Sequence, residues 1–222
     1  MEIQVVKNVL DANLAVANQS REKFRRHGVF VVNVMSSPGS GKTTLLEKTL
    51  TRLASELRAG IIVGDVSTTH DAERLARSGV PVVQVNTDAF GGDCHLAAHV
   101  IAGALDSFDL SRLDLLIIEN VGNLVCPAEF DIGEDAKAVV LSVTEGEDKP
   151  VKYPLMFRVC DVAVLNKIDL LPYLEYDRDA AVAYIHQVHD GMPIFELSAK
   201  TEQGMEAWLG WLREQVARKR SM

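Results

Sequence analysis

The sequence predicts an α/β fold in which a mostly parallel central sheet is flanked by helices on both faces, with an additional helix at the N-terminus. Short and almost continuously apolar runs alternate with longer runs of helical periodicity, as expected for parallel strands that are buried on both faces. Hydrophobic residues make up 47% and charged residues 24% of the 222 residues, which is typical of a globular protein. The chain shows no repeat and no linker, so we expect one domain over residues 1–222.

The first segment of the chain predicts a helix. Leu10, Leu14 and Ala17 recur at the spacing of one helical face within residues 3–26. We therefore expect residues 1–28 to form a helical extension that precedes the first strand.

Strands and helices then alternate to the end of the chain. Strands are expected at residues 29–35, 59–63, 82–85, 115–118, 138–143, 162–165 and 194–197. Helices are expected at residues 43–57, 70–78, 96–105, 178–189 and 204–219. Binding sites in such sheets lie at the carboxyl ends of the strands, where most of the motifs described below fall.

Charge and cysteine content narrow the classes of function. The formal net charge of −8 argues against a nucleic-acid binder that depends on a basic surface and against binding to an anionic membrane. No apolar run approaches the roughly 18 residues that span a bilayer, and the N-terminus lacks the pattern of a signal peptide. Three cysteines do not form a disulfide framework, so we expect a cytoplasmic protein without nucleic-acid binding or membrane insertion.

The loop after the first predicted strand has the pattern of a phosphate-binding P-loop. It reads Ser36-Ser37-Pro38-Gly39-Ser40-Gly41-Lys42-Thr43-Thr44 and opens a predicted helix, although Ser36 stands where a glycine is usual. Backbone N–H groups of the loop and the helix would surround the phosphates of a nucleotide. Lys42 would reach the β- and γ-phosphates, and the Thr43 hydroxyl would hold Mg²⁺. The alternative is a glycine-rich turn that only caps the helix.

A second motif, Asn166-Lys167-Ile168-Asp169, follows a late predicted strand and specifies the base. The Asp169 carboxylate can accept hydrogen bonds from the N1–H and the exocyclic amine of guanine, whereas adenine presents an acceptor at N1. Asn166 can brace the loop, and the aliphatic stem of Lys167 can lie across the base. Ser198-Ala199-Lys200 resembles the further guanine-contacting loop of G proteins, although alone it reads equally as a turn.

Acidic residues near the Mg²⁺ site are expected after two other strands. Glu119-Asn120-Val121-Gly122 occupies the place of the Asp-x-x-Gly motif of many GTPases. Glu119 would organise Mg²⁺-bound water, and the Gly122 N–H would contact the γ-phosphate. Asp65 is the candidate second carboxylate near Mg²⁺ or the attacking water, with a capping aspartate as the alternative. Asp71 is interpreted as part of the first turn of a helix.

Cys94, His95 and Cys126 are candidate ligands of a softer metal ion. Thiolate and imidazole are the groups that Zn²⁺ and Ni²⁺ favour, but the sequence has no Cys-x-x-Cys pair and cysteine commonly fills protein cores. From the chemistry alone, metal binding therefore stays open. Cys160 is interpreted as a core residue, and His99 as a residue of a helix face or a group behind the ligands.

These residues lie in blocks that resemble the HypB-type hydrogenase nickel-incorporation GTPases. The blocks are residues 87–99, Glu119-Asn120-Val121-Gly122-Asn123-Leu124-Val125-Cys126-Pro127 and Val143-Thr144-Glu145-Gly146-Glu147-Asp148-Lys149-Pro150. The resemblance runs from about Val29 to the C-terminal helix, with the nucleotide motifs in family order. It implies a P-loop NTPase G domain of the group whose members switch by nucleotide-dependent dimerisation.

The resemblance also implies an activity and partners. It implies a GTPase that slowly converts GTP to GDP with Mg²⁺, forms a homodimer promoted by GTP, and binds Ni²⁺ or Zn²⁺. The implied partners are a HypA-type accessory protein and the large subunit of [NiFe] hydrogenase, which would receive nickel. Cys94, His95 and Cys126 match the metal ligands of this family at its dimer interface.

Two departures from the family pattern concern nickel. No cysteine or histidine occurs before His27, so the N-terminal nickel motif of many relatives is not expected here. Ala97 stands where relatives often have aspartate, and Asp93 is a candidate oxygen ligand in its place.

A dimer would complete the metal site. One chain offers three soft or borderline ligands, whereas a tetrahedral site needs four, so a symmetric dimer could pool two sets. Cys126 follows the switch residue Gly122, so the nucleotide state could re-aim this ligand. Lys149 or Lys152 could reach the nucleotide of a second chain, although a solvated position is the simpler interpretation.

Three other functions stay open. A urease-type nickel GTPase is similar, but that family typically has Cys-Pro-His where Cys94 and His95 are contiguous here. A small-molecule kinase would use Lys42 and Thr43 but would not require the motif at residues 166–169. A nucleotide-gated binding switch with only residual hydrolysis is the alternative that is not primarily an enzyme.

Overall fold

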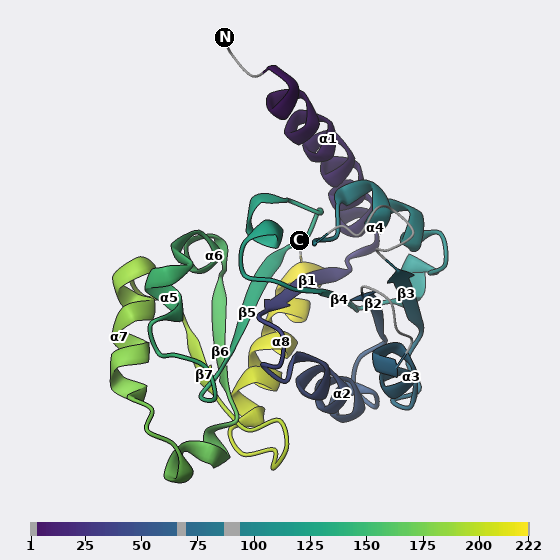
Figure 1. Ribbon diagram of the computed structural model, residues 1–222. Helices are drawn as coiled ribbons and strands as arrows, with labels where there is room; N and C mark the ends of the chain where they lie inside the picture. The colour runs from purple at the N-terminus through teal and green to yellow at the C-terminus, as the bar shows by residue number, and fades with distance from the viewer. Residues whose placement is uncertain (1–3, 66–69, 87–93, 222) are drawn as a thin grey trace.

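All seven strands that the sequence predicts are present and pair in parallel in one sheet. The computed structural model describes residues 4–65, 70–86 and 94–221. The strand order is β3-β2-β4-β1-β5-β6-β7 (Figure 1). The strands are β1 (Phe30–Ser36), β2 (Ala59–Asp65), β3 (Val82–Asn86), β4 (Leu115–Gly122), β5 (Ala136–Ser142), β6 (Val162–Asn166) and β7 (Ile194–Glu196). Because β1 and β4 are neighbours, the loop after β1 and the acidic end of β4 meet at one edge of the sheet.

Helices cover both faces of this sheet, as expected from its apolar strands. The α-helices are α1 (Gln4–His27), α2 (Lys42–Leu53), α3 (His70–Ala76), α4 (Ala98–Leu105), α5 (Lys149–Lys152), α6 (Pro154–Val159), α7 (Arg178–Val188) and α8 (Met205–Arg220). Short 3₁₀ helices are η2 (Leu110–Arg112), η3 (Cys126–Glu129) and η4 (Ile168–Tyr173).

Alternate residues of β1 divide the core between the two faces. Phe30, Val32 and Val34 pack with residues of α2, α3 and α8 on one face. Val29 and Val31 pack on the other face, with residues of α1 and α4. Residues of α6 and α7 cover β5 and β6 in a third cluster. The period of two along each strand thus explains why the strands read as continuous apolar runs.

Several helix boundaries differ by one to four residues from the sequence-based prediction, and two of these differences have a visible cause. The second helix was expected to extend to residue 57 but ends at Leu53, where the N–H groups of Glu56 and Leu57 turn back onto its carbonyl. The helix expected from residue 96 begins only at Ala98. Asn120 accepts a hydrogen bond from the Leu96 N–H, which holds this part of the backbone out of the helix.

Helix α1 is present as predicted, and its C-terminal part lies against the rest of the structure (Figure 1). Ala17 and Phe24 are completely buried, whereas Leu10 and Leu14 are 41% and 45% exposed. Asn13 fixes the helix in place, because its side chain donates to the Asp131 carbonyl and accepts from the Ala98 N–H at the start of α4. In the described part of the chain, no helix combines the length and apolar character needed to cross a membrane.

Asp114 joins three segments at the amino end of β4. Its carboxylate lies 2.5 Å from Arg58 Nη2, accepts the Arg58 backbone N–H at 2.9 Å, and pairs with Arg220 at the end of α8. Burial by itself raises the pKa of Asp114, but the hydrogen bonds from Arg58 and Arg220 outweigh it and lower the pKa to about 2. The ionised carboxylate therefore stabilises the folded state.

Asp114→Asn is expected to lower the free energy of unfolding at neutral pH by about 1–3 kcal/mol, because two guanidinium groups lose their carboxylate partner. Since the folded pKa lies below the unfolded pKa of about 4, the contribution of Asp114 is complete above that value and is lost as the pH falls through about 2. Urea unfolding across this range should show a smaller acid-induced loss in the variant than in the wild type. Equal losses would contradict this role, and the exposed Asp190→Asn provides a control.

Candidate functional site

The predicted P-loop connects β1 to α2 and requires glycine at two positions. Gly39 and Gly41 have φ angles of 80° and 89°, in the left-handed region that disfavours other residues. A Cβ atom at Gly41 would also lie 2.6 Å from the side-chain nitrogen of Asn166. The loop is therefore shaped both by its own backbone and by contact with the β6 end.

Lys42 is almost buried in this loop and points at the end of β4. Its Nζ donates to the Asn120 carbonyl and lies 3.8 Å from Glu119 Oε1. Lys42 thus lines the cleft beside the loop that would hold phosphates.

Thr43 brings two carboxylates together at the start of α2. Its hydroxyl oxygen lies 2.7 Å from Glu119 Oε1 and 3.1 Å from Asp71 Oδ2. A hydroxyl with neighbouring carboxylates is the oxygen set that Mg²⁺ prefers, so the residues fit this ion. Asp65 ends β2, but its side chain lies outside the described part of the structure.

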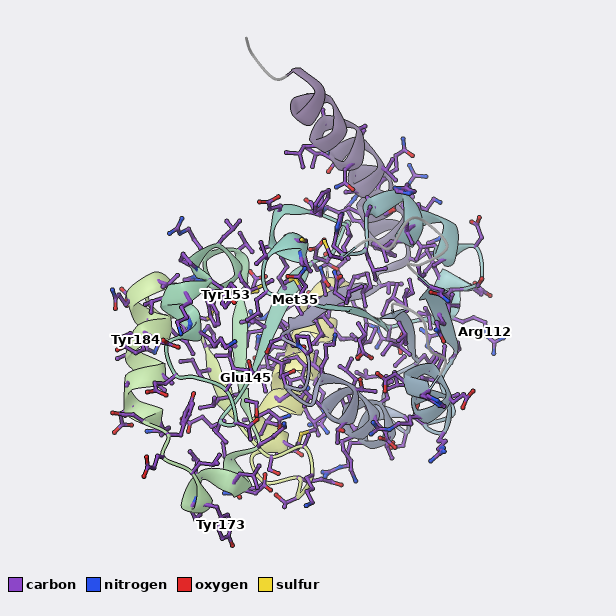
Figure 2. All side chains as sticks on the ribbon, viewed as in Figure 1. Met35, Arg112, Glu145, Tyr153, Tyr173 and Tyr184 are labelled. Carbon is purple, nitrogen blue, oxygen red and sulfur yellow. The ribbon has the colours of Figure 1, made fainter. Side chains whose placement is uncertain are left out.

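These groups line an open cleft with a volume of about 450 Å³. The lining consists of residues 36–44 together with Asp71, Arg74, Glu119, Val121 and Gly122. Gly122 closes one side, because a Cβ atom there would lie 3.3 Å from the Pro38 backbone. Ser37, directly after β1, donates to Glu145 in the loop after β5, which Figure 2 labels near the middle of the view.

Asn166 connects the P-loop to both predicted base-binding loops. Its side-chain nitrogen donates to the Ser40 carbonyl at 2.9 Å, and its side-chain oxygen accepts from the Lys167 and Ala199 N–H groups at 2.8 and 3.0 Å. Lys167 adopts a left-handed φ of 64°, and its Nζ donates to the Gly39 carbonyl at 2.7 Å. The structure thus brings three motifs together that are far apart in the sequence.

Asp169 lies in η4, one turn beyond Asn166. Its Oδ1 atom is buried and has no hydrogen-bond partner among the described residues. A buried carboxylate oxygen of this kind suits a ligand with paired N–H donors. Ser198 and Ala199 are buried beside the Asn166 contact, whereas Lys200 is exposed.

The three candidate ligands of a softer metal ion lie on two segments near the carboxyl end of β4. Cys94 and His95 precede α4, and Cys126 begins η3. Cys94 is exposed, and its Sγ lies 3.9 Å from His95 Nδ1. The His95 ring stacks on Phe130 with centroids 3.8 Å apart, and the Asn123 side chain donates to the Cys94 carbonyl at 3.3 Å. Cys126 is half-buried at the start of η3.

One chain does not assemble these ligands into a closed metal site. Among residues 4–65, 70–86 and 94–221, no group of three His, Cys, Asp or Glu side chains is placed to hold a metal ion. Asp93 lies outside the described residues. His99 lines a separate apolar groove beside β3, and Cys160 is buried, with its thiol pKa raised by that burial.

The two candidate lysines of the segment after β5 both have partners within the chain. Lys152 pairs with Asp148 at 2.6 Å, which raises the pKa of its ammonium group. The Lys149 ammonium lies 5.5 Å from the centre of the Tyr153 ring.

Comparison with known proteins assigns the chain to a family. Residues 30–196 match the family described as "CobW/HypB/UreG, nucleotide-binding domain". The hydrogenase maturation factor HypB of Escherichia coli (strain K12) is 48% identical over 213 residues, which cover 96% of this chain and 72% of that protein. The chain belongs to the HypB family of hydrogenase maturation factors.

Two solved HypB structures share its fold. The HypB structure from Archaeoglobus fulgidus is 40% identical with a TM-score of 0.86, and the match covers 93% of this chain and 100% of that one. HypB from Helicobacter pylori, solved in complex with nickel, is 37% identical with a TM-score of 0.87, covering 94% and 97%. Both the resemblance and the P-loop NTPase-like α/β fold predicted from the sequence are confirmed.

Several residues that line the cleft or contact the Cys94–His95 segment were not predicted from the sequence. Asp71 was assigned only to a helix turn, because its approach to Thr43 depends on how α3 packs beside α2. Arg74, which donates to Thr44 at 3.2 Å, was missed for the same reason. Phe130 carried no motif at all. Asn33, which accepts from the Asn120 side chain behind the cleft, had a usable signal, since it is a polar residue within an apolar strand.

Gly41→Ala is expected to abolish tight nucleotide binding by this HypB family member, because the new Cβ displaces Asn166. The matched control is Gly79→Ala, which has a similar φ of 79° but open space around it. Both variants should lose about 1–2 kcal/mol of stability from the left-handed backbone. Titration with a fluorescent guanine nucleotide should show weakened binding only for Gly41→Ala, and equal affinities in the two variants would contradict the packing argument.

Proposed function

We propose that this HypB family member is a GTP-hydrolysing metallochaperone that binds nickel or zinc and assists nickel insertion into the large subunit of [NiFe] hydrogenase. The observation that carries the proposal is the position of the β4 end. Glu119 at this end enters the phosphate cleft, and Asn123, just beyond it, binds the Cys94 carbonyl. A candidate nucleotide site and a candidate metal site are therefore only a few residues apart along one strand end.

In this proposal, residues 1–222 form a single GTPase domain whose first 28 residues are a helical extension. The protein acts in the cytoplasm as a homodimer that GTP promotes. A HypA-type accessory protein and the hydrogenase large subunit are its partners. Membership of the HypB family supports this assignment.

The proposed hydrolysis depends on charge placed around the phosphates. Lys42 would exchange its contact with the Asn120 carbonyl for the β- and γ-phosphate oxygens, and the Gly122 N–H would contact the γ-phosphate. Thr43, Glu119 and Asp65 would hold Mg²⁺, with Asp71 beside Thr43. When bound, this ion would neutralise charge that develops on the phosphates.

Guanine selection is assigned to Asp169, with Asn166, Lys167 and the loop 198–200 around the base. The buried Asp169 oxygen would accept a hydrogen bond from guanine. Adenine would leave the carboxylate without this donor, because its N1 atom is itself an acceptor. The Asn166 contacts to Ser40 and Ala199 would set the distance between the base and the phosphates.

The cargo is assigned to Cys94, His95 and Cys126. Thiolate and imidazole suit both Ni²⁺ and Zn²⁺, and two chains would supply enough ligands for complete shells. Since Cys126 lies four residues beyond Gly122, GTP and GDP would hold this ligand differently. The nucleotide state would thereby set how tightly the metal is held.

Lys42→Ala is expected to reduce single-turnover GTP hydrolysis by about 100- to 1,000-fold while leaving the fold intact, because one positive group on the phosphates is lost. Lys48→Ala is the matched control, since Lys48 lies on the same helix but pairs with Glu202 at 3.1 Å. Quenched-flow or phosphate-release measurements compare the three proteins. Hydrolysis at the wild-type rate in Lys42→Ala would refute the assignment of this loop.

Asp169→Asn is expected to weaken GTP binding at least about tenfold, because the amide cannot replace both carboxylate acceptors. Xanthosine triphosphate should bind the variant better than GTP does, since its C2 oxygen can accept from the new amide. Competition between the two nucleotides measures this change, with the exposed Asp179→Asn as control. An unchanged preference for GTP would place the guanine contact elsewhere.

A further inference from the structure

A buried amide stands between the two proposed sites. Asn120 is 1% exposed, and its side-chain oxygen accepts from the N–H of Leu96, which directly follows His95, at 3.1 Å. Its backbone carbonyl accepts from Lys42 Nζ. A single residue of β4 thus contacts the lysine of the phosphate cleft and the segment that carries two candidate metal ligands.

The local backbone explains this double contact. Between Val34 and Ser36, β1 advances two residues while β4 advances three, from Glu119 to Gly122, so β4 contains an extra residue there. Such a bulge re-aims side chains and often lies next to an active site. The freed Val121 N–H is satisfied by the Asn120 side-chain oxygen at 3.0 Å.

The alternation of side chains along β4 connects the two faces of the sheet. Ile117 packs with the α2 face and Ile118 with the α4 face. Glu119 continues the first series and reaches Thr43, and Asn120 continues the second and reaches Leu96. Lys42 lies close to both residues, so a displacement of its ammonium group changes contacts on both faces.

A further series of hydrogen bonds leads from the Asn120 side-chain amide toward β5. Its side-chain nitrogen donates to Asn33 Oδ1 at 3.2 Å, and Asn33 Nδ2 donates to Glu134 Oε1 at 3.3 Å. Asn33 is completely buried, and Glu134 is 7% exposed. Burial raises the pKa of Glu134, and the charge of Lys137 opposes that shift.

The same series of contacts leads back to His95. Lys137 Nζ lies 3.4 Å from Glu134 Oε1 and donates to the Phe130 carbonyl at 3.3 Å. The Phe130 ring is stacked on the His95 ring. Asn120 therefore positions His95 in two ways. It binds the neighbouring Leu96 backbone directly, and it is connected through Asn33, Glu134 and Lys137 to Phe130, which contacts the His95 ring.

We propose that Asn120 is a positioning residue that transmits the nucleotide state from Lys42 to the Cys94–His95 segment. Transfer of Lys42 from the Asn120 carbonyl to a phosphate releases the β4 bulge, and the change reaches His95 through Leu96 and through Asn33, Glu134 and Phe130. Tightly packed polar groups in a dry interior move together, because each lost hydrogen bond is costly there. The inference rests on the proposed function and adds to it the path by which nucleotide and metal sites influence each other.

The test compares Ni²⁺ affinity in two nucleotide states. The full chain is loaded with Mg²⁺ and either GDP or a non-hydrolysable GTP analogue, and NiCl₂ is titrated in competition with a chromophoric chelator. The wild type should show affinities that differ by about 5- to 150-fold between the states. In Asn120→Ala this ratio should fall to within about twofold of unity, while Ni²⁺ still binds the GDP form through the intact ligands.

Two further variants separate transmission from general destabilisation. Thr49→Val removes a buried hydrogen bond to the Trp208 ring nitrogen, 3.0 Å away, and should lower stability while keeping the wild-type ratio. Phe130→Leu removes only the ring contact with His95 at a half-buried position and should reduce the ratio in part.

The outcomes distinguish this inference from the proposed function. A wild-type ratio of unity would overturn the inference together with the proposed coupling of nucleotide and metal. A normal wild-type ratio that persists in folded Asn120→Ala would overturn only the role of Asn120. Should Asn120→Ala fail to fold, an unchanged ratio in Phe130→Leu would overturn it instead.

Discussion

The parallel pairing of β1 with β4 is the constraint on which the rest of the site depends. It places the P-loop, which follows β1, against Glu119 and Gly122 at the end of β4. It also places Asn33 beside Asn120 in the interior of the sheet. Without this register, Lys42 would have neither the Glu119 carboxylate nor the Asn120 carbonyl within reach. The phosphate cleft and the segment of the candidate metal ligands thus share one structural support.

The buried polar groups within this sheet destabilise the folded state unless they are hydrogen-bonded. An unpaired buried amide costs about 1–3 kcal/mol, so Asn33 and Asn120 are tolerated because each binds the other and a further partner. Two apolar side chains at these positions would fill the core without needing hydrogen-bond partners. Their presence at the junction of two proposed sites is consistent with a role in function at the expense of packing.

Much of the fold was predictable because it follows from local patterns. Continuous apolar runs identified all seven strands, and the P-loop and the motif at residues 166–169 could be recognised from residue types and spacing. Helices α5 and α6 were missed because four and six residues are too short to show a helical period. The roles of Asp71 and Phe130 arise from packing between distant segments, which no local pattern encodes. The late start of α4 has the same origin, since Asn120 binds the Leu96 N–H.

In the proposed mechanism, one chain couples a guanine-nucleotide site to a soft-metal site. Linkage requires that a metal bound more tightly in one nucleotide state changes the nucleotide preference by the same factor. The most direct measurement is therefore the ratio of affinities for a non-hydrolysable GTP analogue and GDP, determined with and without saturating Ni²⁺. Coupling between the two sites should change this ratio by about 5- to 150-fold when Ni²⁺ binds. An identical ratio in the presence and absence of Ni²⁺ would contradict it.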